Sequence, residues 1–296
     1  MKPPTLKDRL EYIGVVVFVR AIRLLPNGVA VRLGGLLGRL AFDLVRKRRR
    51  VTLANIRAHL DRAGEGRSPA AIGRRSYVNF GMAIAEFARV PCVDMDYIRK
   101  HISFEGLSHL DRALDEGKGG VLVTGHFGSW ELMGCVLVRL GYPLTFVVGV
   151  QRNGLVQALM NRLRGECGIR VIEPVSLLET TRVLRDNRFI AMLSDQDARR
   201  QGVFVDFLGQ PASTHAGAAR LALITGAPLI TGFIIRTDLT RHSIVIEEPL
   251  YVDRSLDRED WMLSMTRAYT GSIEAYVKRY PEQWLWAHRR WKTRPG

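Results

Sequence analysis

A histidine and a glutamate lie five residues apart in the segment TGHFGSWEL, residues 124–132. An apolar run ends at residue 124 and another begins at Glu131, so His126 stands where a predicted strand gives way to a predicted helix. A carboxylate that accepts the Nδ1 proton of an imidazole fixes its tautomer and leaves Nε2 free as a base. This placement favours a His126–Glu131 pair that takes a proton from a substrate over a buried histidine beside a helix-capping acid.

A serine and a cysteine close to this pair lack the setting of a catalytic nucleophile. Gly128-Ser129-Trp130 does not have the flanking pattern of a nucleophile elbow, and we expect Ser129 to be the N-cap of the helix. Cys135, inside an apolar helix, is more often a small core residue. A His–Glu pair without a protein nucleophile suits deprotonation of a substrate hydroxyl, which then attacks an activated acyl or phosphoryl group directly.

The elements that must position these residues are predicted from residue 121 onward. Strand-length runs occupy residues 121–124, 145–150, 169–172, 189–194, 203–208, 228–236 and 243–250, and helix-length segments occupy 129–140, 155–167, 176–187 and 213–225. This alternation predicts an α/β fold with a mixed, largely parallel sheet flanked by helices. Ligands bind beyond the carboxyl ends of strands in such sheets, where both His126 and the triplet Asp195-Gln196-Asp197 would lie.

The N-terminal part of the chain, residues 5 to about 90, is predicted to be helical, with breaks at Pro26 and in a linker at residues 61–69. The first apolar core runs only from Tyr12 to Val19. A helix that spans a membrane needs about 20 mostly apolar residues, so this run is too short.

Residues 29–45 are again apolar, with arginines spaced through them, and they are followed by the basic run Arg46 to Arg50. Apolar helices closed by a basic cluster are typical of helices that lie on an anionic membrane surface. We therefore predict a membrane-associating helical region at residues 1–50 and an α/β catalytic domain at residues 51–296. An ordinary helical subdomain with a solvated basic face is the alternative.

The charge of the chain predicts an anionic partner. The 44 Lys and Arg residues outnumber the 29 Asp and Glu residues, which gives a net charge of +15. No nucleic-acid fold signature accompanies the basic run, so no nucleic-acid partner is expected, although a non-enzymatic basic membrane- or nucleic-acid-binding protein is the alternative class. The three cysteines are odd in number and lack metal-ligand spacing, so we expect a reduced compartment, no disulfide framework and no metal site.

Five ordered blocks resemble the late (lauroyl/myristoyl) acyltransferases of lipid A biosynthesis, within the lysophospholipid/glycerolipid acyltransferase superfamily. They are residues 74–89, 124–132, 151–169, 194–230 and 281–295, and together they cover nearly the whole chain. Glu131 in place of aspartate, and its Gly-x-Trp-Glu surroundings, are similar to this branch. Gly154, where the branch usually has proline, and Ala198 depart from the pattern away from the His–Glu pair.

The resemblance implies an acyltransferase that moves a fatty acyl chain from an acyl carrier protein or acyl-CoA thioester to a hydroxyl of a lipid A precursor. His126 would be the general base, Glu131 would orient it, and Asp195 would complete the catalytic set, without a cofactor. A lysophospholipid or glycolipid (mannolipid-type) acyltransferase is the alternative within the same chemistry. The expected location is the cytoplasmic face of the cell inner membrane, with peripheral or shallow anchoring.

Substrate-binding residues are expected in the same blocks. Arg152 and Arg164 would serve either the oxyanion or the acceptor phosphates, because a guanidinium fork suits both. Gln196 and Asp197 are also assigned to substrate binding, with a turn acid as the alternative for Asp197. The basic tail at residues 288–295 would bind phosphate or membrane lipid, or be a solvated charge run. The helices at 29–45 and 129–140 would line a groove for the acyl chain, and the +15 charge would steer an acidic carrier protein.

Overall fold

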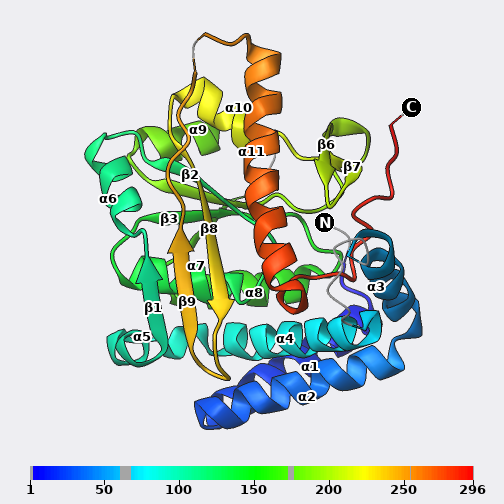
Figure 1. Cartoon of the computed structure of the whole chain (residues 1–296). Coiled ribbons are helices and arrows are strands. Elements are labelled where there is room, and N and C mark those ends of the chain that lie inside the picture. The colour runs from blue at the N-terminus through cyan, green and yellow to red at the C-terminus, as the bar shows by residue number, and fades with distance from the viewer. Residues whose placement is uncertain (1–2, 61–67, 173–176, 254, 296) are drawn as a thin grey trace.

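The computed structural model describes residues 3–60, 68–172, 177–253 and 255–295. A seven-stranded sheet has the order β1–β9–β8–β2–β5–β3–β4 (Figure 1). Its strands are β1 (Ile102–Glu105), β2 (Gly120–Thr124), β3 (Leu144–Val147), β4 (Arg170–Ile172), β5 (Phe189–Leu193), β8 (Leu229–Arg236) and β9 (His242–Ile246). The β8–β9 pair is antiparallel and the other pairs are parallel. The prediction of a mixed, largely parallel sheet is therefore confirmed.

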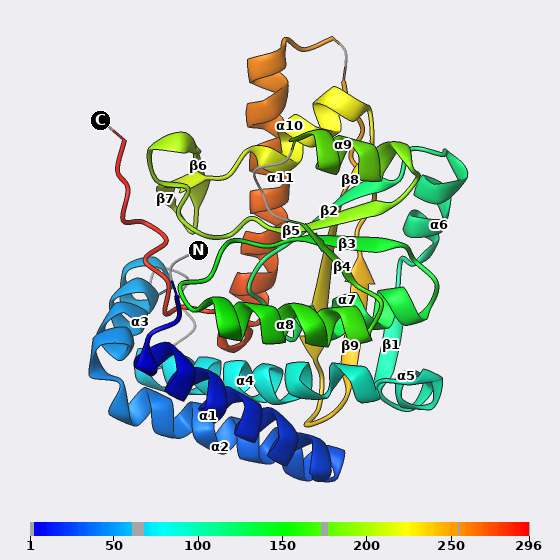
Figure 2. The same ribbon diagram turned by 180° about the vertical axis from the view of Figure 1, so that it is seen from behind.

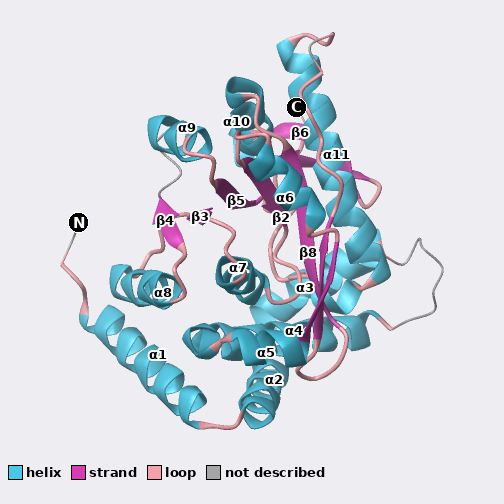
Figure 3. Cartoon of the chain, turned by 90° about the vertical axis from the view of Figure 1, so that its left-hand side faces the viewer, coloured by secondary structure: helices cyan, strands magenta, loops and turns pink. Residues whose placement is uncertain are grey.

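Helices cover both faces of this sheet, as Figure 3 shows. Helices α7 (Trp130–Arg139) and α8 (Gly154–Glu166) lie on one face, and α9 (Leu177–Arg185) and α10 (Gly217–Thr225) lie on the other. Strand β2 is consequently buried along its whole length, which explains its unbroken apolar sequence. The remaining elements of this part are α6 (Ser108–Asp115) and α11 (Arg258–Arg279), with short 3-10 turns η3 (Arg199–Gln201) and η4 (Pro281–Gln283).

A second layer of helices lies beyond α7 and α8 (Figure 2). It contains α1 (Leu6–Leu24), α2 (Asn27–Leu44), α3 (Arg46–His59), α4 (Pro69–Arg89), η2 (Val90–Cys92) and α5 (Met95–His101). Helices α2 and α4 approach closely because glycines face one another, and a Cβ on Gly38 would lie 2.0 Å from the Tyr77 carbonyl oxygen. The guanidinium of Arg89 donates to the carbonyls of Ile22, Arg23 and Leu25. It thus supplies hydrogen-bond donors to carbonyl groups at the C-terminal end of α1, which lack partners within the helix.

A buried ion cluster joins this helical layer to the sheet. Arg236, at the end of β8, donates through both terminal nitrogens to Glu86 of α4 at 2.7 Å, and His242 of β9 lies 3.3 Å from the same carboxylate. Burial alone would raise the pKa of Glu86, but Arg236 and His242 outweigh it and hold that pKa well below its usual range. Glu86 therefore stays ionised and fixes α4 against the adjoining ends of β8 and β9.

The first two helices are part of the main core. Val19, Ile22 and Ala30 are buried in the same cluster as residues of α7 and of the sheet. The boundary predicted at residue 50 falls inside α3, which runs from Arg46 to His59. In the part of the chain that the structure describes, no helix combines the length and apolar character needed to cross a membrane.

Some predicted elements differ from the observed ones. The run at 203–208 forms β6 (Val203–Phe207), which pairs antiparallel with β7 (Gln210–Thr214) in a separate hairpin instead of joining the sheet. Residues 213–214 end β7, so the helix predicted from 213 begins only at Gly217. Residue 176 and most of the predicted linker, residues 61–67, lie outside the described residues.

Candidate active site

His126 and Asp195 lie beyond the ends of neighbouring parallel strands. Thr124 of β2 pairs with Leu193 of β5, and each chain continues two residues further to its polar side chain. The Nδ1 atom of His126 lies 2.7 Å from Oδ1 of Asp195, and the backbone N–H of His126 donates to Oδ2 at 2.7 Å. Because an ionised carboxylate only accepts hydrogen bonds, Nδ1 carries the proton and Nε2 is the unprotonated nitrogen of the neutral ring.

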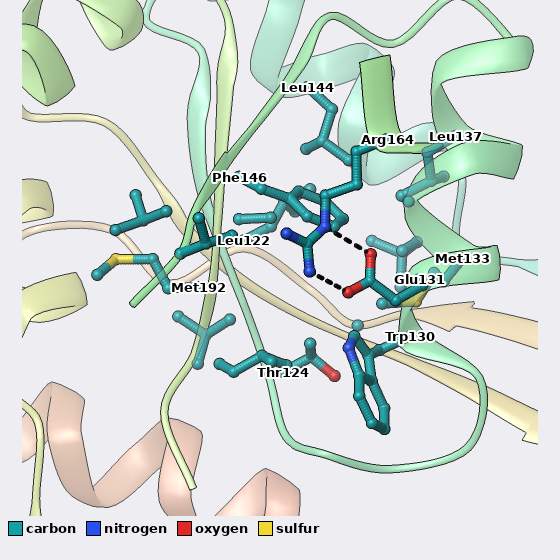
Figure 4. A pocket seen from close by; sticks show the side chains of 18 residues that line it. Leu122, Thr124, Trp130, Glu131, Met133, Leu137, Leu144, Phe146, Arg164 and Met192 are labelled. Atoms are coloured by element: carbon teal, nitrogen blue, oxygen red, sulfur yellow. Dashed lines mark hydrogen bonds and ion pairs between the residues drawn. The ribbon is translucent and has the colours of Figure 1, made fainter. Parts of the chain in front are cut away.

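The predicted contact between Glu131 and His126 is wrong, because Asp195 occupies Nδ1. Glu131, in the first turn of α7, instead faces Arg164 of α8 (Figure 4). The guanidinium donates to both carboxylate oxygens, from Nε at 3.0 Å and from a terminal nitrogen at 2.5 Å. Both side chains are buried, and a buried cation and a buried carboxylate each need a charged partner.

Two glycines of the TGHFGSWEL segment make this geometry possible. A Cβ on Gly125 would lie 3.0 Å from Oδ2 of Asp195, so the absence of a side chain leaves room for the carboxylate. Gly128 has φ +56°, and a Cβ there would lie 2.0 Å from the Ile234 carbonyl oxygen. This left-handed turn aims the chain from His126 into α7.

The charge state of Asp195 follows from its neighbours. Burial alone would raise the pKa of Asp195, but the charge of His126 and hydrogen bonds from His126 and Trp284 outweigh burial and lower the pKa to about 2. The carboxylate is therefore ionised at neutral pH. It can stabilise a positive charge on the imidazole when Nε2 takes up a proton.

An apolar pocket lies between the sheet and helices α7 and α8 (Figure 4). Thr124 and Trp130, which flank His126 in the sequence, form part of its wall, and the Trp130 and His126 rings are 5.1 Å apart. The apolar lining includes Leu122, Met133, Leu137, Leu144, Phe146 and Met192. The ion pair of Glu131 and Arg164 contributes the charged groups of the lining. Of the two helices expected to line an acyl groove, residues 129–140 contribute to this pocket and residues 29–45 do not.

A second hollow lies beside Gln196. It is lined by Val45, Arg48, Tyr77, Phe80, Gln196, Leu285, Ala287 and His288. The side-chain nitrogen of Gln196 is 3.2 Å from Nε2 of His126, where it donates a hydrogen bond to the ring. Gln196 therefore links this hollow to the free ring nitrogen.

The remaining predicted residues are placed as follows. Arg152 is exposed and forms an ion pair with Glu11 of α1 at 3.2 Å. The backbone N–H of Asp197 donates to Nε2 of His288, and its carboxylate accepts from Thr293. Arg162 is exposed. Cys135 is a buried core residue, as expected.

Ser129 precedes α7 at the predicted N-cap position, but its side chain makes no capping hydrogen bond. Its buried hydroxyl has no hydrogen-bond partner among the described residues. The expectation of a capping side chain is therefore wrong, although the helix begins where it was predicted.

The C-terminal block contributes residues that the sequence did not identify. Trp284 donates from Nε1 to Oδ2 of Asp195 at 2.8 Å. Arg290, expected to face phosphate or lipid, is fully buried and donates to the carbonyl oxygens of Gln196 and Ser213. The only signal in the sequence was the high aromatic and basic content of residues 281–295, which does not reveal a partner.

The comparisons agree with the sequence resemblance. Residues 5–293 match the family model for bacterial lipid A biosynthesis acyltransferases. The chain belongs to this family.

Several curated relatives are similar to this family member. The palmitoleoyltransferase of lipid A biosynthesis from Escherichia coli is 26% identical over 92% of this chain and 87% of the relative. The lauroyltransferase from the same organism is 25% identical over 97% of this chain and 92% of the relative. A phosphatidylinositol mannoside acyltransferase from Mycolicibacterium smegmatis is 31% identical, but over 53% of each chain. The match thus spans about half the length of that mannoside relative.

The buried ion pair yields a stability prediction. Glu131→Gln should lower the free energy of unfolding by about 3–5 kcal/mol, because it leaves the buried Arg164 guanidinium without a counter-charge. Chemical denaturation at pH 7 measures the change. Glu11→Gln, which breaks the exposed pair with Arg152, is the matched control and should cost less than about 1 kcal/mol. Equal losses in the two variants would contradict the structural role of Glu131.

Proposed function

We propose that this chain transfers a fatty acyl group from a carrier-bound thioester to a hydroxyl of a lipid acceptor, with a lipid A precursor as the acceptor class. The observation that carries the proposal is an ionised carboxylate that orients a histidine beside an apolar pocket. Such a pocket suits an acyl chain, and the oriented imidazole suits a hydroxyl nucleophile. Family membership supports the same chemistry.

In the proposed reaction, Nε2 of His126 takes the proton of the acceptor hydroxyl while the hydroxyl oxygen attacks the thioester carbonyl. Asp195 stabilises the imidazolium that forms. The carbon–oxygen bond forms, the carbon–sulfur bond breaks, and the imidazolium returns the proton to the departing thiolate. Backbone amides in the first turn of α7 provide the positive end of a helix dipole for the developing oxyanion.

We assign one substrate to each hollow, because Trp130 of the apolar pocket and Gln196 of the second hollow both contact the His126 ring. The acyl chain would enter the apolar pocket between the sheet and α7. The acceptor would approach from the hollow beside Gln196, where Arg48 offers a guanidinium for phosphate and Tyr77 and Phe80 offer aromatic surface. A mannosylated phospholipid is the second candidate acceptor, which the similarity to the mannoside acyltransferase favours.

The test is product analysis with purified protein. Acyl carrier protein thioester or acyl-CoA is supplied with a bis-phosphorylated lipid A precursor or a phosphatidylinositol mannoside, and the lipids are analysed by mass spectrometry. One added acyl chain on a lipid hydroxyl, with stoichiometric release of thiol, is expected. Intact donor and unmodified acceptors in every combination would overturn the proposal.

We also propose that α1 and α2 rest on a membrane. Large apolar side chains on their outer side are exposed and form what we call the apolar stripe. It consists of Leu6, Leu10, Ile13, Val17, Leu24, Val29, Leu36, Leu37, Leu40 and Leu44. The exposed arginines Arg9, Arg20, Arg32 and Arg39 belong to the same two helices. Apolar side chains next to basic ones suit the boundary between headgroups and acyl chains of anionic lipids.

Substitutions in the apolar stripe test membrane binding better than removal of residues 1–50, which would delete core residues such as Ile22. The triple variant Leu6→Gln, Leu10→Gln, Ile13→Gln should weaken sedimentation with anionic vesicles by roughly tenfold or more, because three apolar side chains no longer enter the lipid. The matched control replaces the exposed Leu178, Ile224 and Leu256 by Gln and should bind like the wild type. Equal binding by both triple variants would exclude the stripe as the contact.

A further inference from the structure

The C-terminal strap, residues 281–291, is joined to the segment that carries His126. Phe127 and Trp284 form an antiparallel bridge. The N–H of Gly128 donates to the Gln283 carbonyl at 2.9 Å, and the N–H of Leu285 donates to the His126 carbonyl at 3.1 Å. The backbone of the strap is therefore fixed directly beside the imidazole.

Within the strap, Trp284 is held rigidly. Its side chain is 1% exposed, and its ring makes edge contacts with Phe207, Trp286 and Trp291 at centroid distances of 5.4, 4.7 and 6.3 Å. The hydroxyl of Ser76 donates to its carbonyl oxygen. An indole packed in this way has one position for its N–H, and that N–H points at Asp195.

Asp195 receives donors from two sources. His126 supplies its ring Nδ1–H and its backbone N–H, so these two contacts move with His126 itself. The Trp284 indole at 2.8 Å supplies the third, which comes from a different part of the chain. It is thus the contact that fixes the carboxylate independently of the ring that the carboxylate must orient.

Other titratable groups around this pair come from the strap and from the loops beside β5 and β7. They are His215, His288, Arg290 and Asp197. Burial lowers the pKa of His215 and of His288, which favours their neutral forms. Burial lowers the pKa of Arg290 to about 10, so it stays charged at neutral pH. The electrostatic effect of these groups on His126 and Asp195 is the same with or without the indole N–H.

We propose that Trp284 is a positioning residue for proton transfer: its indole N–H holds the Asp195 carboxylate against Nδ1 of His126 and sets the pH at which the ring takes up a proton. The inference rests on the proposed role of His126 as the base. Without the indole donor, the negative charge of the carboxylate interacts more strongly with the imidazolium. The protonated ring is then favoured and the free base is available only at higher pH.

Trp284→Phe and Trp286→Phe form a matched pair for the test. Trp286 is as deeply buried in the same strap, and its Nε1 donates to the Pro281 carbonyl at 2.7 Å, so each substitution removes one buried indole N–H. In Trp284→Phe, the acid limb of the kcat/KM profile should move to higher pH by roughly half a unit to one unit, so kcat/KM measured on that limb should fall about three- to tenfold. In Trp286→Phe, the midpoint of that limb should stay at the wild-type pH.

Nuclear magnetic resonance provides a second readout that needs neither activity nor a substitution. In the wild-type protein, the indole N–H signal of Trp284 should shift with the ring titration of His126, whereas that of Trp286 should not. The inference would be overturned if the Trp284 signal does not shift during this titration. An unchanged acid limb in a folded Trp284→Phe variant would overturn it as well. Absence of acyl transfer in the wild type would instead overturn the proposed function, since the titration can still be followed.

Discussion

Asp195→Asn is expected to lower kcat by about 10³–10⁴-fold, because it removes the charge that stabilises the imidazolium. The asparagine amide fits the same space, but its NH2 group can face Nδ1 and favour the tautomer with a protonated Nε2. That tautomer cannot act as a base. Steady-state acyl transfer at neutral pH measures the loss, and an unchanged circular dichroism spectrum shows that the fold is retained.

Asp197→Asn is the control for this substitution. Asp197 lies two residues further along the same loop, and its carboxylate accepts from Thr293 instead of from the ring. The control should keep kcat within about threefold of the wild type, as expected for a residue outside the reacting pair. Similar activity of the two variants would show that the carboxylate on Nδ1 does not support the reaction.

His126→Ala is expected to lower kcat/KM by about 10²–10⁴-fold without unfolding the protein, which is the usual contribution of a general base. The ring is partly exposed, and its removal leaves space beside Trp130 and Asp195. Added imidazole should therefore restore part of the activity. His109→Ala, at a half-buried position of α6, is the control and should retain full activity. A His126→Ala enzyme with the wild-type rate would remove His126 from the mechanism.

The strand ends allowed the site to be located from sequence, but its internal contacts required the structure. Alternation of apolar runs placed His126 and Asp195 beyond two strands, and the observed sheet order shows that these strands are neighbours. Strand order depends on long-range packing that local sequence does not encode. The short spacing between His126 and Glu131 therefore suggested a contact, while the true partner lies 69 residues away.

Two other features could not be predicted from the sequence, for related reasons. Arg164 looked like a ligand for phosphate, but a charged residue facing inward from a helix also needs a buried counter-charge, which Glu131 supplies. Trp284 lies in an aromatic and basic tail whose residues are distant from the site in sequence. Its role depends on how the last segment folds back past the ends of β2 and β5. No periodicity or spacing in residues 281–291 predicts where that segment runs.

The family resemblance was predicted from the five blocks and is confirmed over residues 5–293. In the structure, four of the five blocks contribute groups to the candidate site. Block 124–132 carries His126 and the Glu131 carboxylate, and block 151–169 carries the arginine that pairs with Glu131. Blocks 194–230 and 281–295 carry the groups around Nδ1 of His126. The sequence therefore indicated which segments meet at the site, although it assigned the wrong carboxylate to the ring.

His126 and Asp195 are expected to act as one unit in acyl transfer, and a double-mutant comparison tests this most directly. The kcat values of His126→Ala, Asp195→Asn and the double variant are measured with the same thioester and acceptor. Because residues of one catalytic unit are strongly non-additive, the double variant should be no slower than His126→Ala alone, to within about threefold. A double variant whose loss equals the product of the two single losses would contradict the account.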